Sequence, residues 1–516
     1  MINYNNKLFK FMLIIVMSGL VFGIDAGLVS GTIKFIKAEF GLSSLQVGTV
    51  VSAPAFGAII ALLFSGSLVD RLGRKKMMVI IGIFYMISAV LSTFATSYMM
   101  LVLARMLGGM AFCCLSIAAM YIGELAPSDK RGRYVASNQV MMGVGFFLAY
   151  LFNYVCILLL NENSIFFSTE NIWRTMFATE IPVVTIWILL LYFIPESPRW
   201  LMKKGRDQEA LQVISQVNPP ENVDLIVAEI KENLVSVESN ISVAAQLKIM
   251  FSTRMRKILI IGIGLGVVQS FSGMGAISYY SPMIFEQVGL GQDSAFFQTT
   301  LLGFISIVFS LIAMSLVDKH GRKLILVVGL LAICLSHLSI WYGFDHAKYD
   351  ITEAGMTKIE NVIDVTPLKN DIGKHFTTDK SFKEFIHSKY DEKDVTLHEG
   401  AIINAFITLN STLIVAAIFI FKAAFFFSIG PMMWVVLSEI TPNVIRSVAI
   451  PTFGLIASLT AFFVQKFFPW QLSTFGAADT FLIYGVCSFL GVILVIFILP
   501  ETKNKSIEEI ERHLTS

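Results

Sequence analysis

Three ionisable residues lie inside long apolar stretches of the sequence, where a charge is costly and for that reason usually functional. Asp25, Arg105 and Glu180 lie in the first, fourth and sixth of these stretches. A buried carboxylate that binds a guanidinium when ionised, and releases it when protonated, can couple proton uptake to a change of conformation. We therefore treat these residues as candidates for proton chemistry. A static ion pair that holds two helices together is the alternative.

Two further polar residues lie at similar positions. Lys422 lies about two turns before Gly430-Pro431 in an apolar stretch. It has three possible roles, which are to extend toward the membrane surface, to pair with a carboxylate, or to face a cavity and favour an acidic substrate. His337 is expected to pack in the outer half of its helix rather than to act as a ligand.

These residues must be positioned by membrane helices, and a membrane-spanning helix needs about 20 mostly apolar residues. Hydrophobic residues make up 55% of the 516-residue chain and charged residues 15%, against about 25% charged in an average soluble domain. We predict an all-α membrane protein with twelve transmembrane helices, at residues 8–32, 45–69, 77–96, 98–123, 133–160, 173–195, 257–285, 295–317, 323–344, 408–438, 443–468 and 477–499.

The charge balance and the motif content exclude several classes of protein. A formal net charge of +2 lacks the basic excess of a nucleic-acid-binding protein. The sequence has no P-loop, dinucleotide fingerprint, zinc motif or nucleophile elbow, so neither an enzyme nor a cofactor or metal site is expected. The five cysteines lie in apolar stretches and are expected to be small buried hydrophobes. The first stretch contains Asp25 and is expected to be a retained helix, not a cleaved signal.

Short basic loops follow the second, fourth and eighth predicted helices, and they predict that these loops and both termini are cytoplasmic. The expected location is the plasma membrane, as a multi-pass protein of a bacterial inner membrane. An external insertion at residues 345–402 is expected to be a solvated loop or a small cap. The predicted divisions are a six-helix half at 1–198, a cytoplasmic helical linker at 199–254, a second half at 255–505 with an external insertion at 345–402, and a cytoplasmic tail at 506–516.

Three short charged motifs occur twice, which predicts two six-helix halves in parallel, the architecture of major facilitator transporters. Carboxylates and guanidinium groups at helix ends can close one side in one state and separate in the other. The alternative is that these charges only fix the topology. The predicted cytoplasmic latch comprises Asp70, Arg71, Arg74, Glu124, Arg131, Glu196, Asp318, Arg322, Glu439, Arg446 and Glu501, with Glu124–Arg131 and Glu439–Arg446 as the expected ion pairs.

Several motifs in fixed order link the sequence to a known family. They are Gly66-x-x-x-Asp70-Arg71-x-Gly73-Arg74-Lys75, Pro195-Glu-Ser-Pro-Arg-Trp-Leu201, Gln269-x-x-Ser272-Gly273 with Tyr279-Tyr280-Ser281-Pro282, Gly430-Pro431-x-x-Trp434 and Pro500-Glu-Thr-Lys503. Over nearly its whole length the chain resembles the sugar porter family of the major facilitator superfamily, and most nearly the bacterial proton-coupled xylose and hexose symporters.

The resemblance implies roles for the buried charges. In such symporters, the positions of Asp25 and Arg105 form the proton site, and relatives that act as facilitators tend to carry a neutral residue at the first position. Glu180 resembles a carboxylate of the xylose symporter, which leaves two roles open for it, namely assisting proton movement or lying in the interfacial layer.

The resemblance also implies a sugar site between the halves, but only part of it is retained. Matching positions are Phe22, Gln139, Gln269, Tyr279, Tyr280, Gly430 and Trp434, with the two tyrosines as an outer gate. Five positions that are usually polar or aromatic are small here, namely Ser270, Gly275, Ser306, Ala457 and Ser458. A site with fewer hydrogen-bonding groups is wider and discriminates less between hydroxylated solutes. A bulkier polyol, a modified or acidic sugar, or a non-sugar solute therefore stays open.

The function expected from the sequence is proton-coupled import of a sugar or sugar-like polyol by alternating access. The alternatives are a passive facilitator, a carrier of an acidic or non-sugar solute, and a solute sensor. The expected partners are the small-molecule substrate, protons and the lipid bilayer, and the chain is expected to be a monomer.

Overall fold

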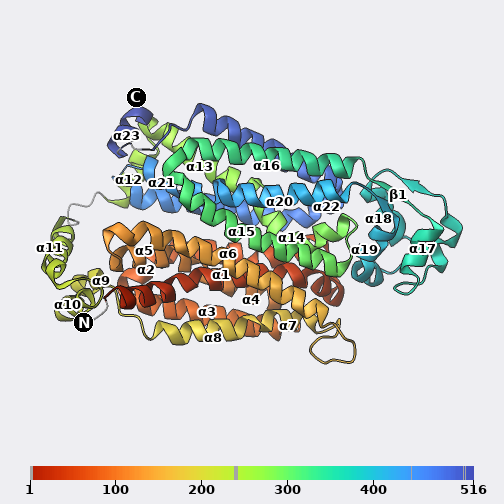
Figure 1. Cartoon of the computed structure of the whole chain (residues 1–516), viewed down its shortest axis with the longest axis horizontal. Helices are drawn as coiled ribbons and strands as arrows, with labels where there is room; N and C mark the ends of the chain where they lie inside the picture. The colour runs from red at the N-terminus through yellow and green to blue at the C-terminus, as the bar shows by residue number, and fades with distance from the viewer. Residues whose placement is uncertain (1–3, 237–241, 443, 504, 506, 516) are drawn as a thin grey trace.

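The computed structural model describes residues 4–236, 242–442, 444–503, 505 and 507–515, and its long helices form one elongated bundle (Figure 1). Within the described residues, eleven helices are long and apolar enough to cross a membrane. The helices of the first half are α1 (Tyr4–Phe40), α2 (Ser44–Leu72), α3 (Arg74–Thr93), α4 (Tyr98–Met110), η1 (Ala111–Cys113), α5 (Cys114–Leu125), α6 (Ser128–Leu158), α7 (Ile172–Ala178) and α8 (Glu180–Leu191).

The second half follows the same plan. Its helices are α13 (Arg256–Phe271), α14 (Met274–Gln287), α15 (Gln292–His320), α16 (Arg322–Asp345), α20 (Ser411–Phe427), α21 (Ile429–Ile440) and α22 (Arg446–Phe497). The short C-terminal helix α23 (Ile507–Thr515) comes last.

The helix α22 contains the eleventh and twelfth predicted spans. Its backbone breaks at Gly476, where φ is 84°. The ring of Phe468 stacks on that of Tyr484 with centroids 6.3 Å apart, whereas these residues would be about 24 Å apart in a continuous helix. The chain therefore folds back at Gly476, and the prediction of an all-α fold with twelve spans is confirmed.

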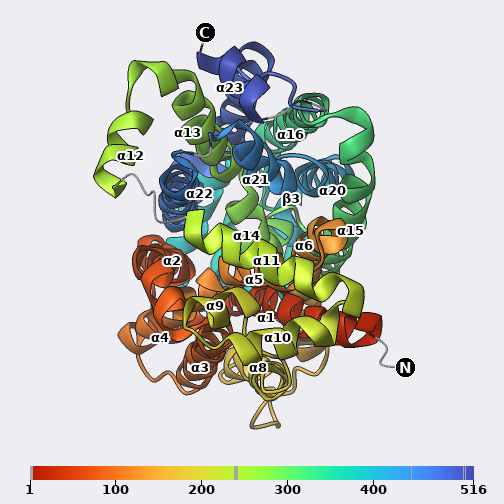
Figure 2. The same ribbon diagram turned by 90° about the vertical axis from the view of Figure 1, so that its left-hand side faces the viewer.

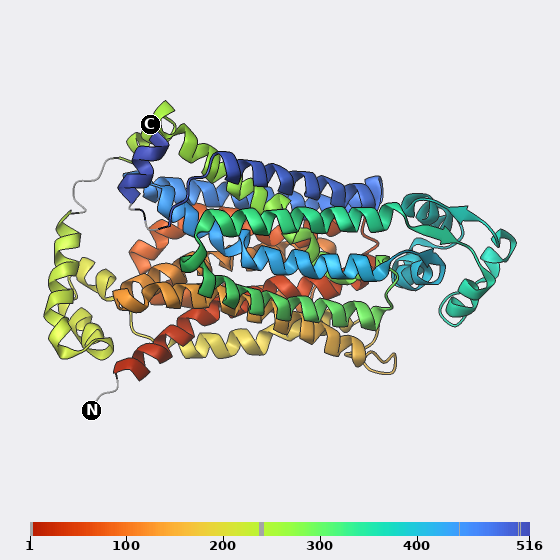
Figure 3. The ribbon, with the colours of Figure 1, turned by 45° about the horizontal axis from the view of Figure 1, so that its top comes forward.

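The two ends of the bundle differ. The described parts of both chain ends reach the same end of the bundle, which we call the terminal end, and residues 345–409 lie at the other, which we call the insertion end (Figures 1 and 3). At the terminal end, the segment between the halves forms α9 (Pro198–Lys203), α10 (Asp207–Val217), α11 (Pro220–Ser236), α12 (Val243–Met250) and η3 (Thr253–Met255). In Figure 2, α9 and α10 lie over the first half, whereas α12 and α23 lie beside the second.

The insertion is a folded unit with its own core, which is more structure than a solvated loop. Its elements are β1 (Lys348–Asp350), α17 (Glu353–Ile359), η4 (Thr366–Asp371), β2 (His375–Phe376), α18 (Asp379–His387), α19 (Glu392–Phe406) and β3 (Ile407–Thr408). The strands form an antiparallel sheet in the order β2-β1-β3. Tyr349, Leu368, Phe382 and Ile386 are buried in its core.

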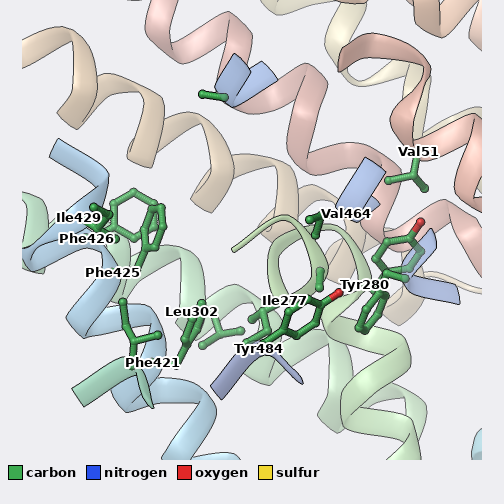
Figure 4. Packing of buried hydrophobic residues seen from close by; sticks show 14 of the residues in the cluster. Val51, Ile277, Tyr280, Leu302, Phe421, Phe425, Phe426, Ile429, Val464 and Tyr484 are labelled. Carbon is green, nitrogen blue, oxygen red and sulfur yellow. The ribbon is translucent and has the colours of Figure 1, made fainter. Parts of the chain in front are cut away.

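The two halves meet along long helical seams. The helix α2 packs against α22, and α6 packs against α15, while α1 packs along α6 and α16 along α22 within the halves. One large apolar cluster draws residues from both halves, including Leu28, Ile277 and Phe421. Figure 4 shows part of this cluster, where α14 and α20 contribute Tyr280 and Phe425. The buried Trp200 and Ile214 join the linker to the core of the first half.

Candidate functional site

Asp25 and Arg105 form an ion pair in the interior of the first half. Arg105 Nη1 lies 2.7 Å from Asp25 Oδ1, and Nη2 donates to the backbone oxygen of Asp25 at 3.0 Å. The two side chains are 0% and 1% exposed, respectively. Two contacts from one guanidinium fix α4 against α1 and give the pair a defined geometry. The Oδ2 atom of Asp25 has no hydrogen-bond partner within the described residues.

The close approach of α4 to Asp25 depends on a small residue. A Cβ atom added at Gly108 would lie 2.5 Å from Ser88 Oγ and 3.2 Å from Asp25 Oδ1. Any larger side chain there would displace α3 or the carboxylate, because such contacts are shorter than atoms tolerate. Gly108 follows Arg105 by three residues and therefore lies on the same face of the helix.

Glu180 completes the predicted set of buried charges. It lies in the first turn of α8 and interacts electrostatically with Asp25 and Arg105. It is 1% exposed, and neither carboxylate oxygen has a hydrogen-bond partner within the described residues. An unpaired carboxylate is costly in such a place. The structure thus gathers the three residues that the sequence singles out, while their role in proton movement stays a prediction.

An aromatic cluster lies between the halves and contains two of the predicted cavity residues. Phe22 packs on Phe112 with ring centroids 4.4 Å apart, and Phe146 packs on Tyr279 at 6.5 Å. Tyr150 donates its hydroxyl hydrogen to the backbone oxygen of Ser278 at 2.8 Å. Because α6 belongs to the first half and α14 to the second, the contacts of Phe146 with Tyr279 and of Tyr150 with Ser278 close the seam.

The two predicted gate tyrosines point to different neighbours. Tyr279 joins the aromatic cluster of the first half. Tyr280 is fully buried, donates to the backbone oxygen of Gln465 at 3.0 Å and packs on Phe468. It therefore ties α14 to α22 within its own half.

The predicted sugar contacts are brought together only in part. Gln269 Nε2 lies 3.5 Å from the backbone oxygen of Gly430, which places α13 beside α21. Trp434 keeps 40% of its surface exposed. Gln139 is partly buried on α6. Neither Gln139 nor Trp434 has a hydrogen bond to the other predicted contacts among those described.

The small residues of the second half are used in packing. Ser270 donates to the backbone oxygen of Ala457 at 3.1 Å, which joins α13 to α22. A Cβ atom at Gly275 would lie 3.0 Å from Gln465 Cγ, so Gln465 fills the space beside this glycine. Ser306 donates to Leu302 of its own helix. Ser458 follows Ala457 in the sequence and is partly buried.

The charged motifs form one cluster in each half at the terminal end. Arg74 Nη2 lies 2.7 Å from Glu124 Oε1, and Arg322 Nη2 lies 2.9 Å from Glu439 Oε1. A hydroxyl completes each cluster, because Ser197 donates to Glu124 and Thr502 donates to Glu439. Both bridges join elements of the same half.

This arrangement differs from the ion pairs expected from the sequence. Arg446 donates to the backbone oxygens of Ser438 and Thr441 at 3.0 Å, and Arg131 is exposed. Glu124, at the end of α5, is bound instead by Arg74 at the start of α3. Glu439, at the end of α21, is bound by Arg322 at the start of α16. Arg71 and Asp70 are exposed, and Asp70 pairs with Lys203 at 3.0 Å. The side chain of Asp318 lies outside the described part of the chain.

Glu196 and Glu501 cap helices. Glu196 Oε1 accepts from the backbone nitrogens of Arg74 and Lys75 at 2.8 and 3.1 Å. Glu501 accepts from those of Arg322 and Lys323 at 3.1 and 3.2 Å. In this way α3 and α16 receive a carboxylate at the N-terminus, where the helix dipole favours a negative charge.

Both capped helices begin after a glycine. Gly73 and Gly321 have φ values of 92° and 84°, a region that side chains disfavour. A Cβ atom at Gly73 would also lie 2.4 Å from Glu196 Oε2. Glycine is therefore needed at position 73 for two reasons. It adopts the positive φ of the turn, and it leaves room for the Glu196 carboxylate that caps α3.

Sequence reasoning missed a second group of residues that join the halves at the insertion end. Lys34 Nζ of α1 lies 2.9 Å from Gln292 Oε1 and 3.4 Å from Glu286 Oε1. A cavity of about 240 Å³ adjoins this contact and reaches His398 and Asn404 of the insertion. The hydroxyls of Ser197 and Thr502 were also missed, although each directly follows the glutamate of a repeated Pro-Glu pair.

Comparison with known proteins agrees with this architecture. The family model described as "Sugar (and other) transporter" matches residues 11–357 and 399–514, so the unmatched segment lies inside the insertion. The arabinose-proton symporter of Bacillus subtilis is 29% identical over 499 residues, 96% of this chain and 92% of that protein. The D-xylose transporter of Levilactobacillus brevis is 31% identical over 501 residues, 96% of this chain and 94% of that protein.

Solved structures give the same result. The partially occluded inward-open conformation of the xylose transporter XylE from E. coli matches with a TM-score of 0.74 and 25% identity, covering 97% of this chain and 100% of that chain. XylE bound to 6-bromo-6-deoxy-D-glucose matches with a TM-score of 0.70 and 26% identity, covering 99% of each. The chain is therefore a multi-pass membrane protein of the sugar transporter family, within the major facilitator superfamily.

Proposed function

We propose that this protein imports a sugar or sugar-like polyol together with protons, by alternating access between its two halves. The observation that carries the proposal is the buried Asp25–Arg105 pair, at 2.7 Å and with one carboxylate oxygen free of protein partners within the described residues. A charge pair of this kind is costly inside a membrane protein unless it serves a function. Its relatives include an arabinose-proton symporter, a D-xylose transporter and galactose-proton symporters, which supports a sugar as the solute and a proton as the coupled ion.

The proposed proton step uses the geometry of this pair. In the ionised state Asp25 holds Arg105 and ties α1 to α4. A proton that reaches Oδ2 neutralises the carboxylate and weakens the bond to the guanidinium, because a charge-assisted hydrogen bond is roughly twice as strong as a neutral one. Arg105 is then free to change partners, and Glu180 is the nearby buried carboxylate that can receive it or pass the proton on.

The proposed solute site lies between the halves, where Phe22 and Tyr279 line one side and Gln269, Gly430 and Trp434 the other. The aromatic rings offer apolar faces to the sugar ring, and the carboxamide of Gln269 pairs with hydroxyl groups. Gln139 is a further proposed member. Ser270, Gly275, Tyr280 and Ser306 are proposed to shape the wall of the site, since these residues are used in packing in this conformation.

The contacts at the two ends support a conformation closed at the insertion end. There, Lys34 and Tyr150 bond across the halves, whereas the Glu124 and Glu439 clusters at the terminal end bond within their own halves. We infer that the terminal end, with its basic loops and both termini, faces the cytoplasm of a bacterial cell. Since both halves of one chain supply the pathway, we also infer that the monomer is the transporting unit.

The test is solute-driven proton movement in liposomes. The purified protein, reconstituted with a pH-sensitive dye inside, receives a panel of pentoses, hexoses, polyols, inositols and sugar acids. The wild type is expected to acidify the interior with at least one of these solutes, and Asp25→Asn is expected to abolish that signal. Asp479→Asn, which changes an exposed aspartate elsewhere in a spanning helix, is the matched control and is expected to behave as wild type.

Two results would overturn the proposal. Uptake of labelled solute without acidification would make the protein a facilitator. A folded protein that carries nothing in the panel would show that the site is not built for sugars.

A further inference from the structure

Lys422 is a fully buried lysine in the spanning helix α20, and the proposed proton step does not use it. Its exposed fraction is 0%. The Nζ atom lies 2.6 Å from Ser278 Oγ and 4.0 Å from Met274 Sδ. It also lies 5.7 Å from the ring centre of Phe146 and 5.3 Å from that of Phe426. Within the described residues, no carboxylate forms an ion pair with this amine.

Such an environment is incomplete for an ammonium group. A buried charge without a counter-charge is strongly destabilising, because the group has lost its hydration and gains no ion pair in return. One hydroxyl and two aromatic faces compensate for part of that loss. What the site lacks is a carboxylate.

Lys422 lies at the seam between the halves, where the carboxylate of a solute could reach it once the seam opens. Ser278 and Met274 lie on α14 of the second half, but Phe146 lies on α6 of the first half. Phe146 also packs on Tyr279, which belongs to the aromatic cluster that closes the seam. When the halves separate at the insertion end, Phe146 must leave Lys422. The amine and the Ser278 hydroxyl then face the opened seam.

Lys422 also lies on the route toward the proposed solute site. It precedes Gly430 by eight residues, or about 12 Å along a helix, on the side of the insertion end. Gly430 contacts Gln269. A solute that enters from the insertion end therefore passes the amine before it reaches the carboxamide.

We propose that Lys422, assisted by the hydroxyl of Ser278, binds the carboxylate of an acidic monosaccharide, such as a uronate or an aldonate. This inference rests on the proposed function and names the substrate class of that site. The small residues Ser270 and Gly275 support it, because both are used in packing and leave fewer groups to recognise hydroxyls. A charge-assisted hydrogen bond to the solute compensates for those missing contacts.

The experiment compares charged and neutral sugars in the same liposomes. Glucuronate, galacturonate and gluconate are tested beside glucose and xylose, for both uptake and proton signal. The wild type is expected to carry at least one of the acids. Lys422→Met is expected to lower its uptake by about tenfold or more, the factor for loss of one hydrogen bond to a charged group. Ser278→Ala, which keeps the amine, is expected to raise the KM for the acid several-fold.

Two control variants separate recognition from folding. Lys466→Met removes another lysine from a spanning helix, where it lies over the ring of Phe462, and is expected to leave acid uptake unchanged. Lys422→Arg keeps the charge and is expected to restore part of the uptake that Lys422→Met loses.

The outcomes distinguish this inference from the function on which it rests. Proton-coupled uptake of neutral sugars alone would overturn the acidic substrate and leave the proposed function standing. Acid uptake that is equal in the wild type and Lys422→Met would also overturn the role of Lys422. A folded protein that carries none of the sugars would overturn both.

Discussion

Asp25 gives Arg105 one carboxylate oxygen, and within the described residues the other oxygen has no hydrogen-bond partner. A proton can therefore arrive at Oδ2 while Arg105 still donates its hydrogen bond to Oδ1. Glu180 is buried beside the pair with both oxygens unpartnered in the described part of the chain. At the scale of single residues, the proposed proton step is therefore expected to be a stepwise exchange of a proton and not the simple breakage of an ion pair.

A second charged group, in the insertion, is expected to make stability depend on pH. Lys383 Nζ lies 3.0 Å from both Asp379 and Glu399. Burial raises the pKa of Glu399, but the charges of Lys383 and Lys37 and the hydrogen bond from Lys383 outweigh burial and lower the pKa to about 2. For Asp379 the balance is reversed, because burial is the larger effect and raises the pKa despite the same lysine.

The sign of the effect of Glu399 follows from linkage. Its folded pKa of about 2 lies below the unfolded value of 4.5, so its stabilisation is present above 4.5 and is lost as the pH falls toward 2. We expect hydrogen exchange in residues 379–399 of the full-length protein to accelerate at a pH between these values, after correction for intrinsic rates. Glu399→Gln should raise exchange already at neutral pH and flatten its pH dependence. The exposed Glu384→Gln is the control, and an equal effect of both substitutions would refute this account.

At the scale of helices, the ends of α3 and α16 depend on residues that are distant in the sequence. Gly73 and Gly321 precede these helices and cannot cap them with a side chain. Glu196 and Glu501 supply the missing acceptors from the loops that follow α8 and α22. Each carboxylate thereby joins the last helix of its half to the third.

Removing this cap should be visible as a loss of stability. Glu196→Ala is expected to lower the free energy of unfolding by about 1–2 kcal/mol, the range for loss of a helix cap, because two backbone N–H groups lose their acceptor. The measurement is thermal unfolding of the purified protein in detergent, with Asp224→Ala of the exposed face of α11 as control. Equal melting temperatures for Glu196→Ala and the wild type would show that water replaces the carboxylate without loss.

These elements show what the sequence predicts well and what it does not. The spans are long apolar stretches, so all twelve could be predicted, and the break at Gly476 falls between the predicted eleventh and twelfth spans. The partner of Glu124 could not be predicted, because Arg131 is close in the sequence while Arg74 is close only in space. For the insertion, the sequence left a solvated loop and a small cap open, and the structure shows a small folded cap. Its individual elements could not be predicted because the helices and strands are short.

At the scale of the whole molecule, polar contacts and the insertion join the two halves at the insertion end. Lys34 of α1 reaches Glu286 and Gln292 of the second half, and α19 of the insertion packs on both α1 and α14. Alternating access requires that these contacts separate when the terminal end closes. The insertion therefore has to release α1 in each transport cycle.

A cross-link tests this requirement directly. In a cysteine-free background, Lys34→Cys with Gln292→Cys joins α1 to α15 across the halves. A short thiol-specific cross-linker is expected to abolish uptake, and its cleavage to restore it. Glu39→Cys with Arg174→Cys is the matched control, because that pair, at 2.6 Å, also lies at the insertion end but within the first half. Full transport by the cross-linked Lys34–Gln292 pair would contradict rocking of the halves.

The sheet of the insertion has a practical consequence. The strand β1 follows α16 almost directly, β3 precedes α20, and the two strands pair with Lys348 opposite Thr408. The chain therefore leaves the bundle and returns to it at neighbouring points. Residues between β1 and β3 could therefore be replaced by a short turn, and the ends of α16 and α20 would stay close together. The insertion is equally a rigid handle on a small membrane protein, suited to carry an epitope or a fused marker for imaging single particles.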